Sequence, residues 1–109
     1  MYNEELARRL VEAVSDEADV TTRKMFGGFA VMLSGNMIGG VIGDDLMVRV
    51  GPNRYPDLIT LPGARPMDMT GKASKSTLLV AGEVVADDDE FRGWVQAGRE
   101  FVATLAPKR

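Results

Sequence analysis

The chain carries its clearest strand signal in Arg23-Lys24-Met25-Phe26-Gly27-Gly28-Phe29, a run that continues with apolar residues to Leu33. Aromatic, valine and methionine residues follow one another almost without interruption here, which is typical of a strand buried on at least one face. We therefore predict one strand over residues 24–33. The neighbouring segments should supply the strands that pair with it.

Two turns and two further strands follow this run. The turns are Ser34-Gly35-Asn36 and Gly43-Asp44-Asp45, and the strands that they delimit are residues 37–42 and 46–50. Alternation in the last strand predicts Met47 and Arg49 on the face opposite Leu46. Short connections of this kind join neighbouring antiparallel strands, so the centre of the chain predicts a three-stranded meander.

Helical periodicity marks both ends of the chain. Asn3 is a good N-cap for a helix over residues 4–17, whose apolar residues recur at intervals of three and four. The acidic run Asp87-Asp88-Asp89-Glu90 should cap a final helix that Pro107 ends. The apolar positions of this last helix are Phe91, Trp94, Val95, Gly98, Phe101, Val102 and Leu105.

The middle of the chain contains weaker signals. Pro56 marks a short helix or turn near residues 57–59, and prolines and a glycine over residues 62–66 predict a loop. Residues 67–69 and 77–80 are the remaining strand candidates. The predicted fold is a two-layer α+β domain over residues 1–109, with an antiparallel sheet of about five strands and the terminal helices on one face. The predicted order is α-β-β-β-α-β-β-α.

Composition narrows the possible chemistry. The 109 residues include no cysteine and no histidine, which removes thiolate nucleophiles, disulfides and the commonest general base and metal ligand. We expect no enzymatic activity, no cofactor and no metal. No apolar run is long enough to span a bilayer, and the acidic N-terminus is unlike a signal segment, so we expect a cytoplasmic protein.

The charges are distributed unevenly along the chain. The net charge is −3, but residues 21–80 hold seven basic and four acidic residues. The candidate binding residues in this central segment are Arg23, Lys24, Arg49, Lys72 and Lys75. If the strand ends meet, these cations could contact an acidic partner or phosphate groups; otherwise they are solvated charges that balance the acidic helices. No interleaved aromatic platform of the kind that stacks bases accompanies them.

Three other features have a structural and a functional interpretation. The paired glycines at 27–28 and 39–40 indicate a bulge, or a close approach of the first or last helix to the sheet, rather than a phosphate loop, because no nucleotide-binding motif surrounds them. The acids of residues 87–90 favour capping over metal binding. The methionines of the sheet region either fill the core or form a partner surface, with Met47 and either Met67 or Met69 facing outward.

The motifs together resemble a known family. The run from Arg23 to Gly28, Arg49-Val50-Gly51-Pro52 and Arg65-Pro66-Met67-Asp68 are similar to the N-terminal domain of the TfoX/Sxy competence regulators, which are bacterial proteins. The resemblance implies this α+β fold and a role with the transcription machinery. Those regulators carry a second, C-terminal domain, which we expect to be missing here because the chain ends at Arg109.

Two hypotheses for function follow from these observations. The first is a small non-enzymatic regulatory or protein-interaction domain, with an unidentified protein partner or a second copy bound at a sheet edge or helix face. The alternative is binding of nucleic acid or a phosphate ligand through the central basic residues, which predicts an affinity that falls with salt.

Overall fold

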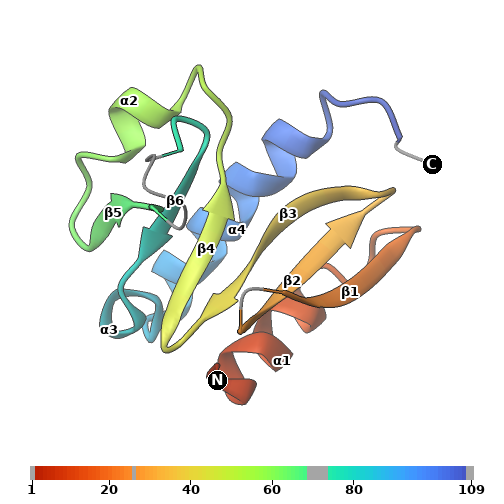
Figure 1. Ribbon diagram of the computed structural model, residues 1–109, viewed down its shortest axis with the longest axis horizontal. Helices are drawn as coiled ribbons and strands as arrows, with labels where there is room; N and C mark the ends of the chain where they lie inside the picture. The colour runs from red at the N-terminus through yellow and green to blue at the C-terminus, as the bar shows by residue number, and fades with distance from the viewer. Residues whose placement is uncertain (1, 26, 69–73, 108–109) are drawn as a thin grey trace.

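The computed structural model describes residues 2–25, 27–68 and 74–107. Within these ranges the elements are, in chain order, α1 (Glu4–Ala13), β1 (Val20–Met25), β2 (Gly28–Leu33), β3 (Asn36–Ile42), β4 (Asp45–Arg49), α2 (Tyr55–Leu58), β5 (Ala64–Pro66), β6 (Thr77–Val80), α3 (Gly82–Val85) and α4 (Asp88–Val102). The strands form one antiparallel sheet in the order β1-β2-β3-β4-β6-β5. Helices α1 and α4 lie behind this sheet in Figure 1. The α+β class and the terminal helices on one face are therefore confirmed, with six strands described where about five were expected.

The segment predicted as a single strand over residues 24–33 is a hairpin. Strands β1 and β2 pair from Val20 opposite Leu33 to Met25 opposite Gly28. Gly27 lies between them with a φ of 71°, a left-handed conformation that glycine adopts without steric cost. The prediction was wrong because apolar residues flank the turn on both sides and hide it in the hydrophobic pattern. Phe26 lies outside the described residues.

A β-bulge changes which side chains of β3 face the helices. The register shifts where β3 passes Val31 and Met32: Val31 pairs with Gly39, whereas Met32 pairs with Met37. Ile38 is the extra residue, and it is 2% exposed in the core. At a bulge, two neighbouring residues of one strand can direct their side chains to the same face of the sheet. Here it points Ile38 toward α4 and leaves Met37 on the opposite face.

The strand predicted at residues 67–69 is also displaced. Strand β5 occupies Ala64–Pro66, Met67 follows it outside the strand, and Met69 lies outside the described residues. Gly63 has a φ of 82°, and its carbonyl accepts a hydrogen bond of 3.0 Å from Ala81 N. Pairing with β6 therefore begins at Ala64, inside the segment that its prolines predicted to be a loop. Pro66 is tolerated because β5 is an edge strand.

The main core lies between the sheet and the helices. Asn3 caps α1 as predicted, accepting a hydrogen bond of 3.0 Å from Leu6 N, although this helix ends at Ala13 rather than near residue 17. Trp94 is 4% exposed, as expected of a core anchor. Gly98 brings α4 close to the sheet, because a Cβ there would lie 3.0 Å from Ile38 Cγ1. No helix in the described part of the chain has the length and hydrophobicity required to cross a membrane.

Candidate functional site

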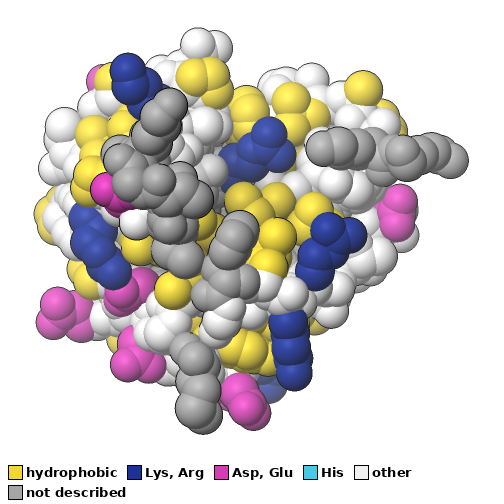
Figure 2. All heavy atoms as spheres, in the orientation of Figure 1, with side chains coloured by type: hydrophobic (Ala, Val, Ile, Leu, Met, Phe, Trp, Pro, Cys, Tyr) yellow, Lys and Arg dark blue, Asp and Glu magenta, His cyan; other side chains and the backbone are white. Residues whose placement is uncertain are grey.

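The face of the sheet turned away from α1 and α4 is lined mainly by apolar side chains. Val48 faces the helices, because its Cγ1 lies 3.4 Å from the Cβ position of Gly98. Met47 must therefore face the other way. The apolar residues that share this second face by strand register are Met25, Ala30, Met32, Met37, Met47 and Leu79. We call them the methionine face; Figure 2 shows hydrophobic side chains gathered at its centre with Lys and Arg around them.

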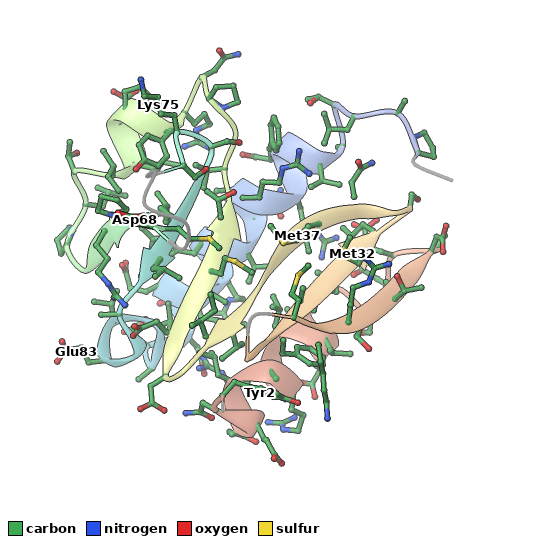
Figure 3. The ribbon with its side chains drawn as sticks, in the orientation of Figure 1. Tyr2, Met32, Met37, Asp68, Lys75 and Glu83 are labelled. Atoms are coloured by element: carbon green, nitrogen blue, oxygen red, sulfur yellow. The ribbon has the colours of Figure 1, made fainter. Side chains whose placement is uncertain are left out.

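Exposure varies across the methionine face. Met25, Met32 and Met37 are half-buried, whereas Met47 is only 2% exposed. Figure 3 shows Met32 and Met37 side by side on neighbouring strands, as their register requires. Met47 lies on the predicted face but is covered, so the partially accessible methionines belong to β1, β2 and β3.

Gly40 makes room at the middle of this face. A Cβ at Gly40 would lie 2.0 Å from Phe29 O and 2.8 Å from Met47 Cε. A Cβ at Gly39 would lie 2.3 Å from Met47 O. The close neighbours of these two glycines are the backbones of adjacent strands and the Met47 side chain, so the predicted approach of a helix is wrong here. The glycine that accommodates a helix–sheet contact is Gly98.

The cations at the start of the sheet lie on opposite faces. Arg23 pairs with Ala30 and is exposed on the side of the methionine face. Lys24 pairs with Phe29, whose ring lies 5.4 Å from that of Tyr2, two residues ahead of α1. Lys24 therefore lies on the helix side of β1. The sheet separates these two side chains, so they cannot act on one ligand group.

Arg49 and Lys75 lie near the other end of β4. Arg49 is on the same side of the sheet as Arg23, but its guanidinium lies 5.3 Å from the Phe101 ring centroid and Nη1 donates to Met37 O at 3.5 Å. Lys75 is exposed ahead of β6, at upper left in Figure 3. Lys72 lies outside the described residues. Of the predicted cations, strand register places Arg23 and Arg49 on one face, and Arg49 is already in contact with β3 and α4.

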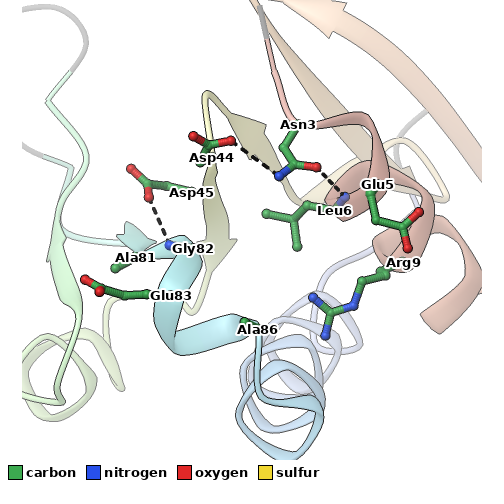
Figure 4. A pocket seen from close by; sticks show the side chains of 10 residues that line it. All are labelled: Asn3, Glu5, Leu6, Arg9, Asp44, Asp45, Ala81, Gly82, Glu83 and Ala86. Carbon is green, nitrogen blue, oxygen red and sulfur yellow. Dashed lines mark hydrogen bonds between the residues drawn. The ribbon is translucent and has the colours of Figure 1, made fainter.

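A cleft of about 380 Å³ separates the start of α1 from the β3–β4 turn and α3 (Figure 4). Its polar groups are largely satisfied within the chain. Asn3 Nδ2 donates to Asp44 Oδ1 at 3.3 Å, and Asp45 Oδ1 accepts from Gly82 N at 3.1 Å. Arg9, on the opposite wall, binds Asp88 at 3.0 Å. These contacts assign the cleft a structural role in joining α1, β4 and α3.

Arg8 holds the pKa of Glu5 at the margin of this cleft below its ordinary value, chiefly by donating hydrogen bonds to it. The Nε–Oε1 distance is 2.8 Å and the Nη2–Oε2 distance is 2.6 Å. Glu5 is exposed, so this pair contributes little to stability. It keeps a negative charge at the first turn of α1, where the helix dipole favours one.

The acidic run before α4 acts as a helix cap, as predicted. Asp87 Oδ1 accepts hydrogen bonds from Asp89 N at 2.8 Å and Glu90 N at 3.0 Å. Asp88 is engaged with Arg9, and Asp89 with Arg92. In the ranges that the structure describes, no group of three or more acidic residues is arranged to hold a metal ion.

Comparison with models of known protein families shows which family the chain belongs to. The family model of the TfoX N-terminal domain matches residues 12–102. The chain belongs to the TfoX N-terminal domain family. No curated protein and no solved structure matches it. The match spans the described sheet and all of α4 of this TfoX N-terminal domain, but only the last two residues of α1.

The sequence did not predict the half-buried pair Met32 and Met37. Strict alternation from Gly39, which faces the helices, would turn Met37 inward and Ile38 outward. The bulge reverses both. The paired glycines of residues 39–40 did indicate a bulge, because glycine inside a strand often marks one, but they did not indicate which side chains it would turn.

Proposed function

We propose that this TfoX N-terminal domain is a small non-enzymatic regulatory domain that binds a protein partner through the methionine face. The observation that supports this most directly is the half-buried pair Met32 and Met37, on the side of the sheet opposite α1 and α4. Apolar side chains at a partly accessible surface gain free energy when a partner removes them from water.

The chemistry of the surface suits a protein partner. Methionine is flexible and polarizable, so a methionine-lined surface adapts to apolar groups of different shapes. Arg23 lies exposed at the margin of this surface, where an acidic residue of the partner would be favoured without a buried charge. The family relationship is consistent with a regulatory role, and we infer that the partner belongs to the transcription machinery.

The proposal is tested with three tagged baits in cells that express the protein natively. They are the wild type, the double variant Met32→Gln/Met37→Gln, and the control Arg8→Gln/Glu12→Gln, which changes exposed residues of α1. Partners identified by mass spectrometry should be retained by the wild type and the control and lost from the methionine variant. Circular dichroism must first show that all three baits are folded.

Two results would contradict the proposal. One is recovery of the same proteins by the methionine variant, which would move the partner surface elsewhere. The other is the absence of any protein above background with the wild type.

The alternative is binding of nucleic acid or a phosphate ligand, and the shared face of Arg23 and Arg49 is the observation that favours it. Fluorescence anisotropy of a labelled DNA duplex at low and at physiological salt would test it. Binding that weakens with salt and with Lys72→Glu/Lys75→Glu, the change expected from the sequence, would support this alternative. No change in anisotropy at low salt would exclude it.

A further inference from the structure

Strand β1 offers a regular edge along the described part of the sheet (Figure 1). It is six residues long, contains no proline, and Thr21, Thr22, Arg23 and Lys24 are all exposed. The opposite edge strand, β5, has three residues and includes Pro66, and Arg65 is tied to Asp45. Short strands and prolines block edge-to-edge pairing. Of the two described edge strands, β1 therefore has the length and the backbone groups to accept another strand.

The outward-facing backbone groups of β1 follow from its pairing with β2. Ser34 N donates to Asp19 O at 2.8 Å, which makes Asp19 and Ser34 a hydrogen-bonded pair. Bonded and non-bonded residues alternate along an antiparallel ladder. The groups of Thr21, Arg23 and Met25 are thus directed to β2. The backbone N–H and C=O groups of the alternate residues, Val20, Thr22 and Lys24, point outward.

We propose that β1 pairs with β1 of a second copy of this chain, antiparallel around a twofold axis at Thr22. In this register Thr22 faces Thr22 of the other copy, and both present outward N–H and C=O groups. Paired threonines on neighbouring strands are favourable. Val20 and Lys24 then face each other across the axis, so the outward groups of all three residues are used.

Charge and backbone pairing together favour this register over the two symmetric registers shifted by two residues. In the twofold register Arg23 faces Thr21 of the other copy. Shifting the pairing by two residues toward the hairpin would place Arg23 opposite Arg23, and directly opposed like charges are destabilising. Shifting it the other way would centre the axis on Thr21 and leave only Val20 and Thr22 with outward groups to pair. The strand thus specifies one symmetric pairing.

The exposed Asp19 adds complementary charge to this register. The hydrogen bond from Ser34 continues the ladder through Asp19, so alternation places its side chain on the same face as Thr21. Because Thr21 faces Arg23 of the other copy, Asp19 lies diagonal to that arginine. Diagonal neighbours are about 7–8 Å apart, within reach of a long side chain. The twofold repeats this acid–base contact on both sides.

The pairing produces a closed dimer. Each copy offers one competent edge, and a twofold contact uses both, so no further copy can add. The half-buried ends of the two methionine faces become adjacent, since Met25 and Met32 lie on the strands nearest the axis. A single strand pair buries less than the roughly 1,200–2,000 Å² of a standard interface, so we expect a dimer that dissociates on dilution. The pairing does not depend on what the methionine face binds.

Cross-linking tests the register. The chain has no cysteine, so Thr22→Cys introduces a single thiol that meets its equivalent across the axis. Directly opposed residues have Cα atoms about 5.5 Å apart, within the range that a disulfide spans. Oxidised glutathione should convert two such thiols into an intermolecular disulfide and be reduced to two glutathiones. Arg23→Cys, exposed on the same strand, should cross-link far less and is the matched control.

Sedimentation velocity tests the association itself. The wild type should shift from monomer to dimer as concentration rises, and Thr22→Pro should stay monomeric because it removes an outward N–H while leaving the β1–β2 ladder its bonds. Thr21→Glu places a carboxylate opposite each Arg23, and two such pairs at about 0.2–1 kcal/mol each tighten the dimer about 2- to 30-fold.

Circular dichroism checks that the variants fold. If Thr22→Pro is unfolded, cross-linking through Thr22→Cys still tests the proposal. A wild type that is monomeric at every concentration would overturn the proposal, as would a dimer that Thr22→Pro leaves intact. Stronger cross-linking by Arg23→Cys than by Thr22→Cys would overturn the register. A monomer that instead binds a peptide of alternating glutamate and valine along β1 would show that an acidic strand, and not a second copy, occupies this edge.

Discussion

Three glycines illustrate how much the environment of this residue type varies along the chain. Gly27 has a positive φ in the β1–β2 turn, Gly40 lies between two strands and under Met47, and Gly93 is exposed on α4. The sequence predicted a bulge or the approach of a helix at both glycine pairs; a bulge does lie beside residues 39–40, but the turn at Gly27 was not predicted. The difference is physical: the apolar pattern around a hairpin turn is the same as that of one buried strand, and the pairing that distinguishes them is not local.

We expect Gly40→Ala to lower the free energy of unfolding by about 2 kcal/mol or more, because the new methyl group would collide with a backbone carbonyl that is fixed in the sheet. Urea denaturation measures the effect. Gly93→Ala is the matched control. A Cβ at Gly93 meets nothing within 4 Å, so alanine should raise stability by about 0.5–1 kcal/mol. Equal effects at the two sites would contradict the environments described.

At the scale of elements, α4 depends on the cap at its N-terminus. Asp87→Ala leaves the N–H groups of Asp89 and Glu90 without their acceptor and should destabilise the protein by about 1 kcal/mol. Asp87→Ser keeps an acceptor at the cap and should restore most of the loss. Thermal unfolding followed by circular dichroism compares the three proteins. A stability equal to that of the wild type in Asp87→Ala would refute the capping role.

Helices α1 and α4 are joined by Arg99. Its Nη1 donates to Ala13 O at 2.9 Å, and its Nη2 lies 3.0 Å from carboxylate oxygens of Asp16 and Glu17. The hydrogen bond from Arg99 holds the pKa of Asp16 below its ordinary value, and the same contact raises the pKa of Arg99. A pairing between residues 83 positions apart could not be read from charge pattern alone.

The Asp16–Arg99 contact predicts a pH dependence. A lowered pKa in the folded state stabilises the protein above the unfolded value of about 3.8, and this contribution disappears as the pH falls through the folded value. Asp16→Asn should therefore unfold at a lower temperature than the wild type near neutral pH, and the two should converge in acid. Glu83→Gln removes an exposed carboxylate from α3 and is the charge-matched control. A constant difference from neutral to acidic pH would contradict the prediction.

At the scale of the whole molecule, one core connects both helices to the sheet. Buried residues of α1, the central strands, α3 and α4 form a single hydrophobic cluster. The periodicity of the terminal helices predicted most of the helical residues that lie in this core. The strand contribution was less predictable, because Ile38 joins this core only through the bulge in β3.

We expect this core to unfold as one cooperative unit. Trp94 is the single tryptophan and is 4% exposed, so its fluorescence reports the packing of α4. Urea unfolding curves measured by Trp94 fluorescence and by far-ultraviolet circular dichroism should coincide. Separate midpoints would show that α4 detaches before the sheet unfolds and would contradict a single unit.

Local sequence alone determined the α+β class, the caps of the terminal helices and the turn at residues 34–36, because periodicity and capping act between residues that are close along the chain. Only the tertiary structure decided that Met32 and Met37 share an accessible face and that β1 is an edge. These properties depend on strand register and on the bulge. Register is set by long-range pairing, so a shift of one residue moves a side chain to the other face of the sheet.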